Sequence, residues 1–249
     1  MTLIVAAACK GGIVVAADSQ VTMGSVRFTT PKLRQLGPQI VWGSAGDVGT
    51  TQVIENELQK HFGSGVDETS IDDLRHKLLD VVNPVQRQAL GRWLGSSETN
   101  PLRSSFLFAG HTAGRAWIFR INLMGESTLH DPDDFSAIGS GEAFAYLARA
   151  SLAHYDLPNT DLDLASVLLY RSMADIIRTS ARGLAFPVSL GQVTGKGVRL
   201  LSEQECQRIE RDANYIGELE AEVVRNVFTE TSRMIPPPEP RAPDGRRSK

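Results

Sequence analysis

The sequence opens with two short apolar runs, Thr2-Leu3-Ile4-Val5-Ala6-Ala7-Ala8-Cys9 and Ile13-Val14-Val15-Ala16-Ala17-Asp18, joined by Lys10-Gly11-Gly12. Short apolar runs on either side of a glycine turn predict a β-hairpin. A tight turn centred near Gly11 would pair the runs antiparallel and bring Asp18 within a position or two of the partner of Thr2. Both faces of the hairpin are apolar, which predicts a sheet covered on both sides.

Thr2 becomes the first residue of the chain if Met1 is removed. Methionine aminopeptidases remove Met1 when the next side chain is small, and that of threonine qualifies. The free amine of Thr2 would then lie beside its own hydroxyl and could act as the base that activates it as a nucleophile. The hairpin alone is better explained as an ordinary N-terminal core strand, so the nucleophile hypothesis needs support from other residues.

Composition and charge exclude several classes of function. The 249 residues are 41% hydrophobic and 22% charged, with a net charge of −3, which is typical of a globular protein without a nucleic-acid or anionic-membrane partner. No apolar run is long enough to span a membrane, and the N-terminus lacks the basic segment of a secretory signal. Cys9 and Cys206 have no metal-type spacing. We therefore expect a cytoplasmic protein with no metal or cofactor.

The remaining elements alternate in groups rather than singly. After the hairpin and a loop or irregular hairpin over 23–31, we expect strands at 32–36 and 39–45 and helices at 50–62 and 71–94. Strands at 105–109 and 115–122 and one within 129–140 follow, then helices at 142–154 and 163–181 and late strands at 188–190 and 197–201. Paired helices between antiparallel strands predict an α+β four-layer αββα sandwich of two antiparallel sheets. A parallel βαβ array would need strands and helices to alternate singly.

The C-terminal part of the chain predicts one long helix and a tail. Ser202 can cap a helix running to about residue 229. Its expected buried face consists of Ile209, Ile216, Leu219, Val223 and Val227. Residues 235–249 are rich in proline and arginine, cannot supply a core and are expected to be disordered. We therefore expect a single domain over 2–234 and a disordered tail over 235–249.

Four features far apart in the sequence could complete a site around Thr2. Asp18 ends the second strand, Lys32 opens the third, and Gly46 stands where the fourth strand turns into the first long helix. The segment Gly139-Ser140-Gly141 lies at another strand-to-helix turn. Each has an ordinary structural explanation, such as backbone freedom for a glycine or a helix cap for Ser140.

Taken together, these motifs resemble the β-type subunits of the proteasome and the simpler bacterial peptidase ring that works with an unfoldase. The resemblance rests on Thr2-Leu-Ile-Val, Ala16-Ala17-Asp18-Ser-Gln-Val-Thr22-Met23-Gly24, Lys32-Leu33, Ser44-Ala45-Gly46, Ser105–Gly110 and Ile138-Gly139-Ser140-Gly141. It covers residues 2 to about 155 and implies the N-terminal nucleophile hydrolase fold. The chain beyond residue 200 is longer than in the simple ring and is similar to another bacterial β-subunit homologue with a C-terminal helical extension.

The resemblance implies a role for each site residue. The hydroxyl of Thr2 would be the nucleophile and its amine the proton acceptor, directly or through a water. Lys32 would lower the pKa of that amine by like-charge repulsion and assist loss of the hydroxyl proton, and Asp18 would hold Lys32 charged and oriented. Ser140 would hydrogen-bond the amine, and the backbone N–H of Gly46 would bind the oxyanion.

The resemblance also implies a substrate and an assembly. A peptide or unfolded protein would lie as an added strand between residues 19–22 and 44–48. Val21, Ser44 and Val48 would line a small-to-medium neutral pocket for the residue before the cut. The chain would form a homo-oligomeric ring or ring-like assembly, with a possible ATP-dependent unfoldase partner.

Two other interpretations stay open at this point. The family has an Asp and a Ser or Thr after its fourth helix, where this sequence offers Asp175 and Ser180, and Asp175 reads as a helix surface residue. The chain could therefore be a catalytically silent structural subunit. It could also be an amidase of a small substrate, or an acyl transferase in which an amine replaces water.

Overall fold

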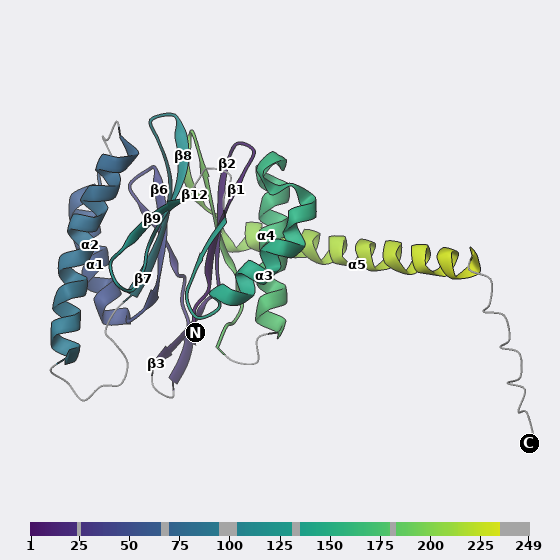
Figure 1. The fold of residues 1–249 in the computed structure, drawn as a ribbon, viewed down its shortest axis with the longest axis horizontal. Helices are drawn as coiled ribbons and strands as arrows, with labels where there is room; N and C mark the ends of the chain where they lie inside the picture. The colour runs from purple at the N-terminus through teal and green to yellow at the C-terminus, as the bar shows by residue number, and fades with distance from the viewer. Residues whose placement is uncertain (24–25, 66–69, 95–103, 131–134, 180–182, 235–249) are drawn as a thin grey trace, which may run out of the picture. The chain divides into compact units, whose positions relative to one another are not determined.

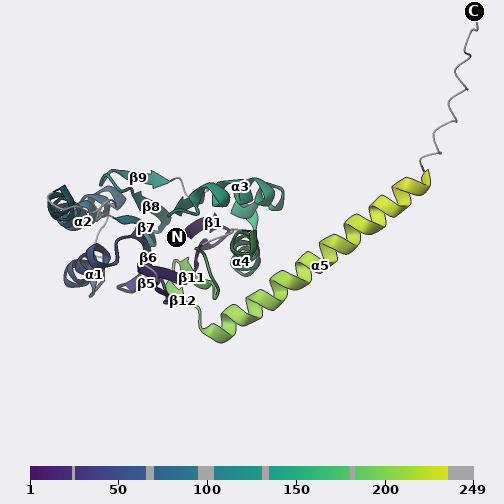
Figure 2. The ribbon, with the colours of Figure 1, turned by 90° about the horizontal axis from the view of Figure 1, so that it is seen from below.

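A computed structural model of the chain describes residues 1–23, 26–65, 70–94, 104–130, 135–179 and 183–234. Residues Met1–Ala213 form one compact unit, and the chain from Asn214 forms a second. The compact unit has four layers, with helices covering the outer face of each of the two sheets (Figure 1). Figure 2 shows the N-terminus lying between the two helical layers. The expected α+β sandwich of two antiparallel sheets is therefore confirmed.

The first sheet is built around the opening hairpin. Its strand order is β10-β1-β2-β11-β12, all antiparallel. The hairpin pairs Ile4 with Ala17 and Cys9 with Gly12, and Gly11 has a φ of +94°, which suits a glycine at the turn. The strands are β1 (Ile4–Cys9), β2 (Gly12–Ala17), β10 (Phe135–Ile138), β11 (Ser189–Thr194) and β12 (Gly197–Leu200).

The second sheet has the order β5-β6-β7-β8-β9 and faces the first. A shared apolar core joins the sheets, with Ile4 and Val15 from the first and Val41, Leu107 and Ile118 from the second. A separate hairpin, β3 (Gln20–Met23) with β4 (Val26–Thr29), occupies the region expected to be a loop or irregular hairpin. The strands of this second sheet are β5 (Leu33–Leu36), β6 (Ile40–Gly46), β7 (Ser104–Thr112), β8 (Arg115–Ile121) and β9 (Ser127–His130).

The strand expected within 129–140 is present as β10, and the structure adds a second strand, β9, which begins earlier, at Ser127. β9 joins the second sheet and β10 joins the first. The sequence between them, Asp131-Pro132-Asp133-Asp134, contains a proline that cannot donate to a strand ladder. One continuous strand could also not serve two facing sheets.

Helices cover the outer face of each sheet. The second sheet is covered by α1 (Val48–Phe62) and α2 (Ile71–Leu94), whose Ile54, Leu58 and Leu74 pack with Trp42 and Phe108 in a second core. On the first sheet lie α3 (Glu142–Leu152) and α4 (Leu162–Thr179), which are joined through the 3₁₀ turns Ala153–Tyr155 and Leu157–Asn159. The helices α1 and α2 thus bury one apolar face each against the second sheet.

The last helix, α5 (Glu203–Met234), begins as expected but does not bury the expected face. Ser202 and Glu205 form a reciprocal cap, because the Glu205 carboxylate accepts from the Ser202 N–H (2.8 Å) and the Ser202 hydroxyl accepts from the Glu205 N–H (3.3 Å).

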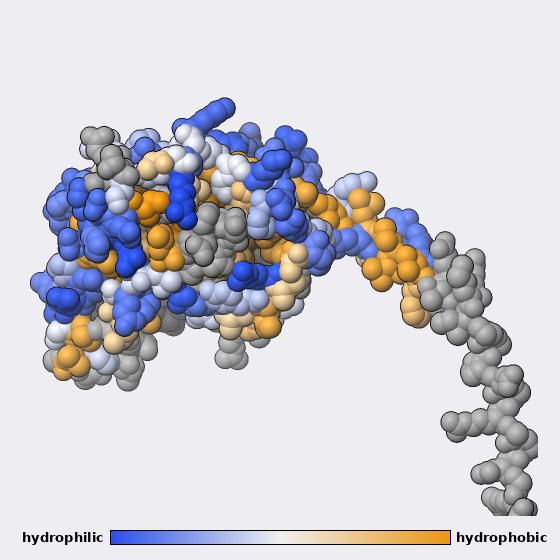
Figure 3. All heavy atoms as spheres, turned by 45° about the horizontal axis from the view of Figure 1, so that its top comes forward, coloured by the Kyte–Doolittle hydropathy of each residue, from blue (hydrophilic) through white to orange (hydrophobic). Residues whose placement is uncertain are grey.

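Of the expected buried face of α5, Ile209 and Ile216 are half-buried. Leu219, Val223 and Val227 are exposed, which corrects the prediction. The compact unit ends at Ala213, and a single helix cannot bury an apolar stripe against itself. Figure 3 shows the apolar side chains on the surface of this helix.

The predicted tail over 235–249 lies outside the described residues. The described helices include none that is both long and apolar enough to cross a membrane.

Candidate active site

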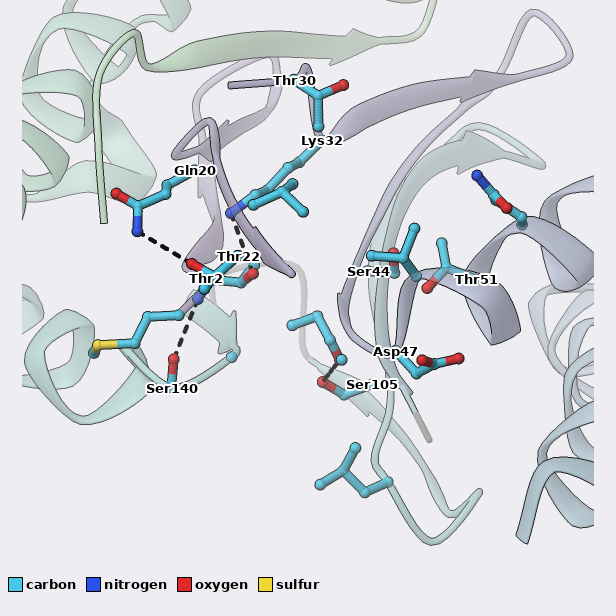
Figure 4. A pocket seen from close by; sticks show the side chains of 18 of the residues that line it. Thr2, Gln20, Thr22, Thr30, Lys32, Ser44, Asp47, Thr51, Ser105 and Ser140 are labelled. Atoms are coloured by element: carbon cyan, nitrogen blue, oxygen red, sulfur yellow. Dashed lines mark hydrogen bonds between the residues drawn. The ribbon is translucent and has the colours of Figure 1, made fainter. Parts of the chain in front are cut away.

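A cleft of roughly 1350 Å³ contains Thr2, Lys32, Gly46 and Ser140 (Figure 4). Strand pairing explains how distant residues meet there. β1 lies between β10 and β2, with Ile4 opposite both Ile138 and Ala17. Continuing that register toward the chain start sets Thr2 beside Ser140 on one side and brings Asp18 to the other.

Lys32 links the hydroxyl of Thr2 to Asp18. Its Nζ donates to Thr2 Oγ1 at 3.1 Å and to Asp18 Oδ1 at 2.7 Å. Asp18 is fully buried and Lys32 is 5% exposed. Burial lowers the pKa of Lys32, and the adjacent Asp18 carboxylate acts against that shift. The ion pair therefore holds an ammonium group within hydrogen-bonding distance of the Thr2 hydroxyl.

Asp18 is held rigidly by the backbone. The N–H of Leu3 donates to Oδ1 at 2.8 Å, and the N–H of Gln20 donates to Oδ2 at 3.0 Å. Together with Lys32, three donors satisfy the carboxylate, which is the condition for burying a charge at low cost. The Asp18 carboxylate thus connects the segments at the starts of β1, β3 and β5 through hydrogen bonds.

Ser140 lies on the other side of Thr2. Its Oγ accepts from the backbone nitrogen of Thr2 at 3.2 Å (Figure 4). Gly139 precedes it with a φ of +102°, and a Cβ there would come within 2.2 Å of the Thr2 carbonyl oxygen. Only glycine permits this approach, so the Gly139-Ser140-Gly141 loop is shaped to bring Ser140 against the chain start.

The amine at the chain start has a perturbed pKa. Burial lowers the pKa of the Met1 ammonium group, and the nearby Lys32 charge lowers it further. With Met1 in place, the nitrogen of Thr2 is an amide and not a base. Removal of Met1 would leave the Thr2 amine in the same surroundings, where Lys32 and Ser140 face it.

Gly46 ends β6 immediately before the N-cap of α1. Its φ is +142°, a conformation that favours glycine. The next residue, Asp47, caps the helix by accepting from the Thr50 N–H at 2.6 Å. A backbone N–H at the start of a helix is suited to bind a negative charge.

The buried side chain of Gln86 on α2, which the sequence did not indicate, supports the turn between β6 and α1 through Ser104. Ser104 Oγ donates to the Asp47 carbonyl oxygen at 3.0 Å. Gln86 then brackets the backbone of Ser104, accepting from its N–H at 3.1 Å and donating to its carbonyl oxygen at 2.6 Å. Gln86 is 4% exposed. A glutamine within a helical pattern reads as a surface residue, so no sequence signal could have found it.

The three residues expected to form the side-chain pocket, Val21, Ser44 and Val48, all line the cleft. The structure adds two ion pairs that the sequence did not suggest. Arg34 pairs with Glu55 at 2.9 Å, and Arg120 pairs with Glu142 at 2.6 Å. The walls of the cleft therefore carry charge, although the two pairs are balanced.

The described structure does not bring Asp175, the candidate for the family's second Asp, to the site. Asp175 lies on the exposed face of α4 and pairs with Arg178 at 3.5 Å, while Ser180 lies outside the described residues. Among the residues that the structure describes, no cluster of His, Cys, Asp and Glu side chains could hold a metal ion.

Comparison with known proteins gives a family match over most of the chain. Residues 2–182 match the family model described as proteasome subunit. The chain is 26% identical to a proteasome subunit beta of Streptomyces griseus over 223 residues, 84% of this chain and 75% of that protein. It is 25% identical to proteasome subunit beta 2 of Pyrococcus furiosus over 151 residues, 58% of this chain and 66% of the relative.

Solved structures with the same fold include two described as Anbu. The ancestral beta-subunit from Yersinia bercovieri superposes with a TM-score of 0.68 at 19% identity, covering 90% of this chain and 96% of that one. The helical assembly of the Anbu complex from Pseudomonas aeruginosa gives a TM-score of 0.66 at 20% identity, covering 95% and 98%. At these identities the likeness concerns the fold.

Proposed function

Because the chain belongs to the proteasome subunit family, we propose that it is a threonine endopeptidase that cleaves peptides or unfolded proteins. The nucleophile is Thr2, exposed as the first residue by removal of Met1. The observation that carries the proposal is the chain of contacts from Asp18 through Lys32 to Thr2 Oγ1, with Ser140 on the Thr2 nitrogen.

The geometry supports the following reaction. Thr2 Oγ attacks the scissile carbonyl carbon, and its proton passes to the Thr2 amine, directly or through a water. The oxyanion is stabilised by the Gly46 N–H, and Lys32 stabilises the negative charge developing on Thr2 Oγ. When the C–N bond breaks, the protonated amine gives its proton to the leaving amine. Water then attacks the ester carbonyl on Thr2, and the Thr2 amine accepts a proton from that water. The amine returns the proton to Thr2 Oγ as the acid is released.

The experiment that tests this proposal is an intact-mass measurement. We expect the purified protein to lack Met1 and to gain the mass of one peptide epoxyketone, located on Thr2 by peptide mapping. The Thr2→Ala variant should gain no mass. A chain that retains Met1 and takes up no probe would overturn the proposal.

The proposed enzyme works as a homo-oligomer, in a ring or ring-like stack whose partner is an unfoldase. Two observations support self-assembly. The solved structure from Pseudomonas aeruginosa with this fold is described as a helical assembly. In addition, α5 exposes Leu219, Val223 and Val227, a run of apolar side chains of the kind that marks a contact between protein chains.

A further inference from the structure

The ion pair between Arg34 and Glu55 lies in the same cleft as the proposed nucleophile, beyond Lys32. Side chains two residues apart on a strand point to the same face, about 6.6 Å apart along the strand. Lys32 contacts Thr2, so Arg34 is the next residue on that face, leading away from the nucleophile. Glu55 meets it from α1, one turn after Thr51, which also lines the cleft.

Arg34 is held in place by three contacts. Its Nε lies 2.9 Å from Glu55 Oε1, and its Nη1 donates to the Lys32 carbonyl oxygen at 3.3 Å. Its guanidinium carbon lies 5.2 Å from the centre of the Trp42 ring, and Trp42 is fully buried. The guanidinium plane is therefore fixed, with apolar core on one side and the cleft on the other.

The pair retains hydrogen-bonding capacity toward the cleft. Within the described part of the chain, neither Arg34 Nη2 nor Glu55 Oε2 has a hydrogen-bond partner. The two side chains are 27% and 32% exposed, so an incoming group can reach them. The pair thus offers donors from a guanidinium next to an acceptor oxygen of a carboxylate.

A carboxamide is the group that complements this arrangement. Its oxygen can accept from Arg34 while its NH₂ donates to Glu55, so both remaining groups are satisfied. A carboxylate would be attracted by Arg34 but repelled by Glu55, and an ammonium group the reverse. An apolar side chain would displace water from the pair and could not replace the hydrogen bonds that the pair makes to that water.

We infer that the cleft selects glutamine as the residue before the cut, through the Arg34–Glu55 pair. The inference rests on the proposed peptidase function and gives its substrate preference. It refines the expected neutral pocket, because the selected side chain is neutral but the residues that select it are charged. Val21, Ser44 and Val48 would flank the stem of the glutamine.

The test compares three peptide epoxyketones that are identical except for glutamine, glutamate or leucine next to the reactive group. Addition to Thr2 is followed by intact mass in the wild-type protein. We expect the glutamine probe to add at least about ten times faster than either of the others, as hydrogen-bond selection at a partly exposed pair allows.

Three variants locate the preference. Glu55→Gln removes the repelling carboxylate, so the glutamate probe should gain about tenfold relative to the glutamine probe. Arg34→Met should abolish the advantage of glutamine over leucine. Glu57→Gln is the matched control on the same helix, since Glu57 pairs with Lys60 outside the cleft, and it should leave the order of the probes unchanged.

The outcomes separate the two proposals. If no probe adds to a wild-type chain that also retains Met1, the proposed function itself fails. If all probes add to Thr2 but leucine adds fastest, or if Glu55→Gln and Arg34→Met keep the wild-type order while melting normally, the glutamine inference is overturned and the peptidase proposal stands.

Discussion

Asp18 is the residue on which the local structure of the site depends. Its carboxylate accepts from two backbone N–H groups and from Lys32, so it serves the backbone and the ion pair together. Both charges are buried, and each is tolerated only because the other is present. A change at Asp18 should therefore affect stability as well as any reaction at Thr2.

We predict that Asp18→Asn lowers the free energy of unfolding by about 3–5 kcal/mol, because it leaves the buried Lys32 ammonium uncompensated. Urea denaturation measures the loss. Asp175→Asn is the matched control, because Asp175 forms an exposed pair with Arg178 and should change stability by less than about 0.5 kcal/mol. Equal losses in the two variants would contradict the prediction.

The second prediction at this scale concerns pH. The Thr2 amine accepts a proton in the proposed reaction, so only its neutral form is active. Burial and Lys32 lower the pKa of the amine at the chain start, and both would act on Thr2 after Met1 is removed. Activity should therefore rise with pH and reach its plateau with an apparent pKa below the ordinary value of about 7.7.

The measurement is kcat/KM between pH 5 and pH 8.5 with a neutral peptide substrate. Because burial and Lys32 lower the pKa of the amine at the chain start, the loss of activity on acidification should occur at a lower pH than for an ordinary α-amine. An acidic limb centred above pH 8, or a rate independent of pH, would show that the amine is not the base.

At the scale of elements, the turn from β6 into α1 is supported by a neighbouring strand and a neighbouring helix. Ser104 at the start of β7 holds the Asp47 carbonyl, and Gln86 of α2 holds the backbone of Ser104. The Gly46 N–H, the proposed oxyanion donor, lies directly before this turn. Its position therefore depends on how α2 packs against the sheet.

We predict that Gln86→Leu costs about 1–3 kcal/mol of stability, because it leaves two buried backbone groups of Ser104 unpaired. It should also slow epoxyketone addition at Thr2 while leaving Met1 removal unchanged. Gln88→Leu is the control, since Gln88 is exposed on the same helix. Wild-type stability and labelling in Gln86→Leu would show that the network does not position Gly46.

At the scale of the whole molecule, the apolar face of α5 is the feature that the single chain leaves exposed. Leu219, Val223 and Val227 recur at four-residue intervals, which sets them along one face of a helix. In the proposed homo-oligomer a second copy of the chain covers this face. The helix would then contribute to assembly rather than to the core of its own chain.

The corresponding prediction is that Leu219→Glu combined with Val223→Glu lowers the assembled mass seen by native mass spectrometry. The melting temperature of the monomer should change little, because these residues lie beyond the compact unit that ends at Ala213. Gln207→Glu adds charge off the stripe and should leave the assembly intact. Unaltered assembly in the double variant would exclude this face as the contact.

The sequence by itself determined the layered fold and the residues that meet at the chain start. Hydrophobic periodicity and glycine turns act over a few residues, so the hairpin, the helix pairs and the order of layers could be read from local patterns. Thr2, Asp18, Lys32 and Ser140 were also named from their motifs, and the structure brings them within hydrogen-bonding distance of one another.

Only the tertiary structure decided which polar residues of the helices face inward. Gln86 and Glu55 lie in helical patterns where a polar side chain reads as solvated, and Arg34 lies on a strand where it could have faced water. The opposite difference occurs in α5. Its apolar stripe predicted burial, but Leu219 and Val223 are exposed. A sequence pattern gives the face of a helix, but what covers that face depends on packing between distant segments.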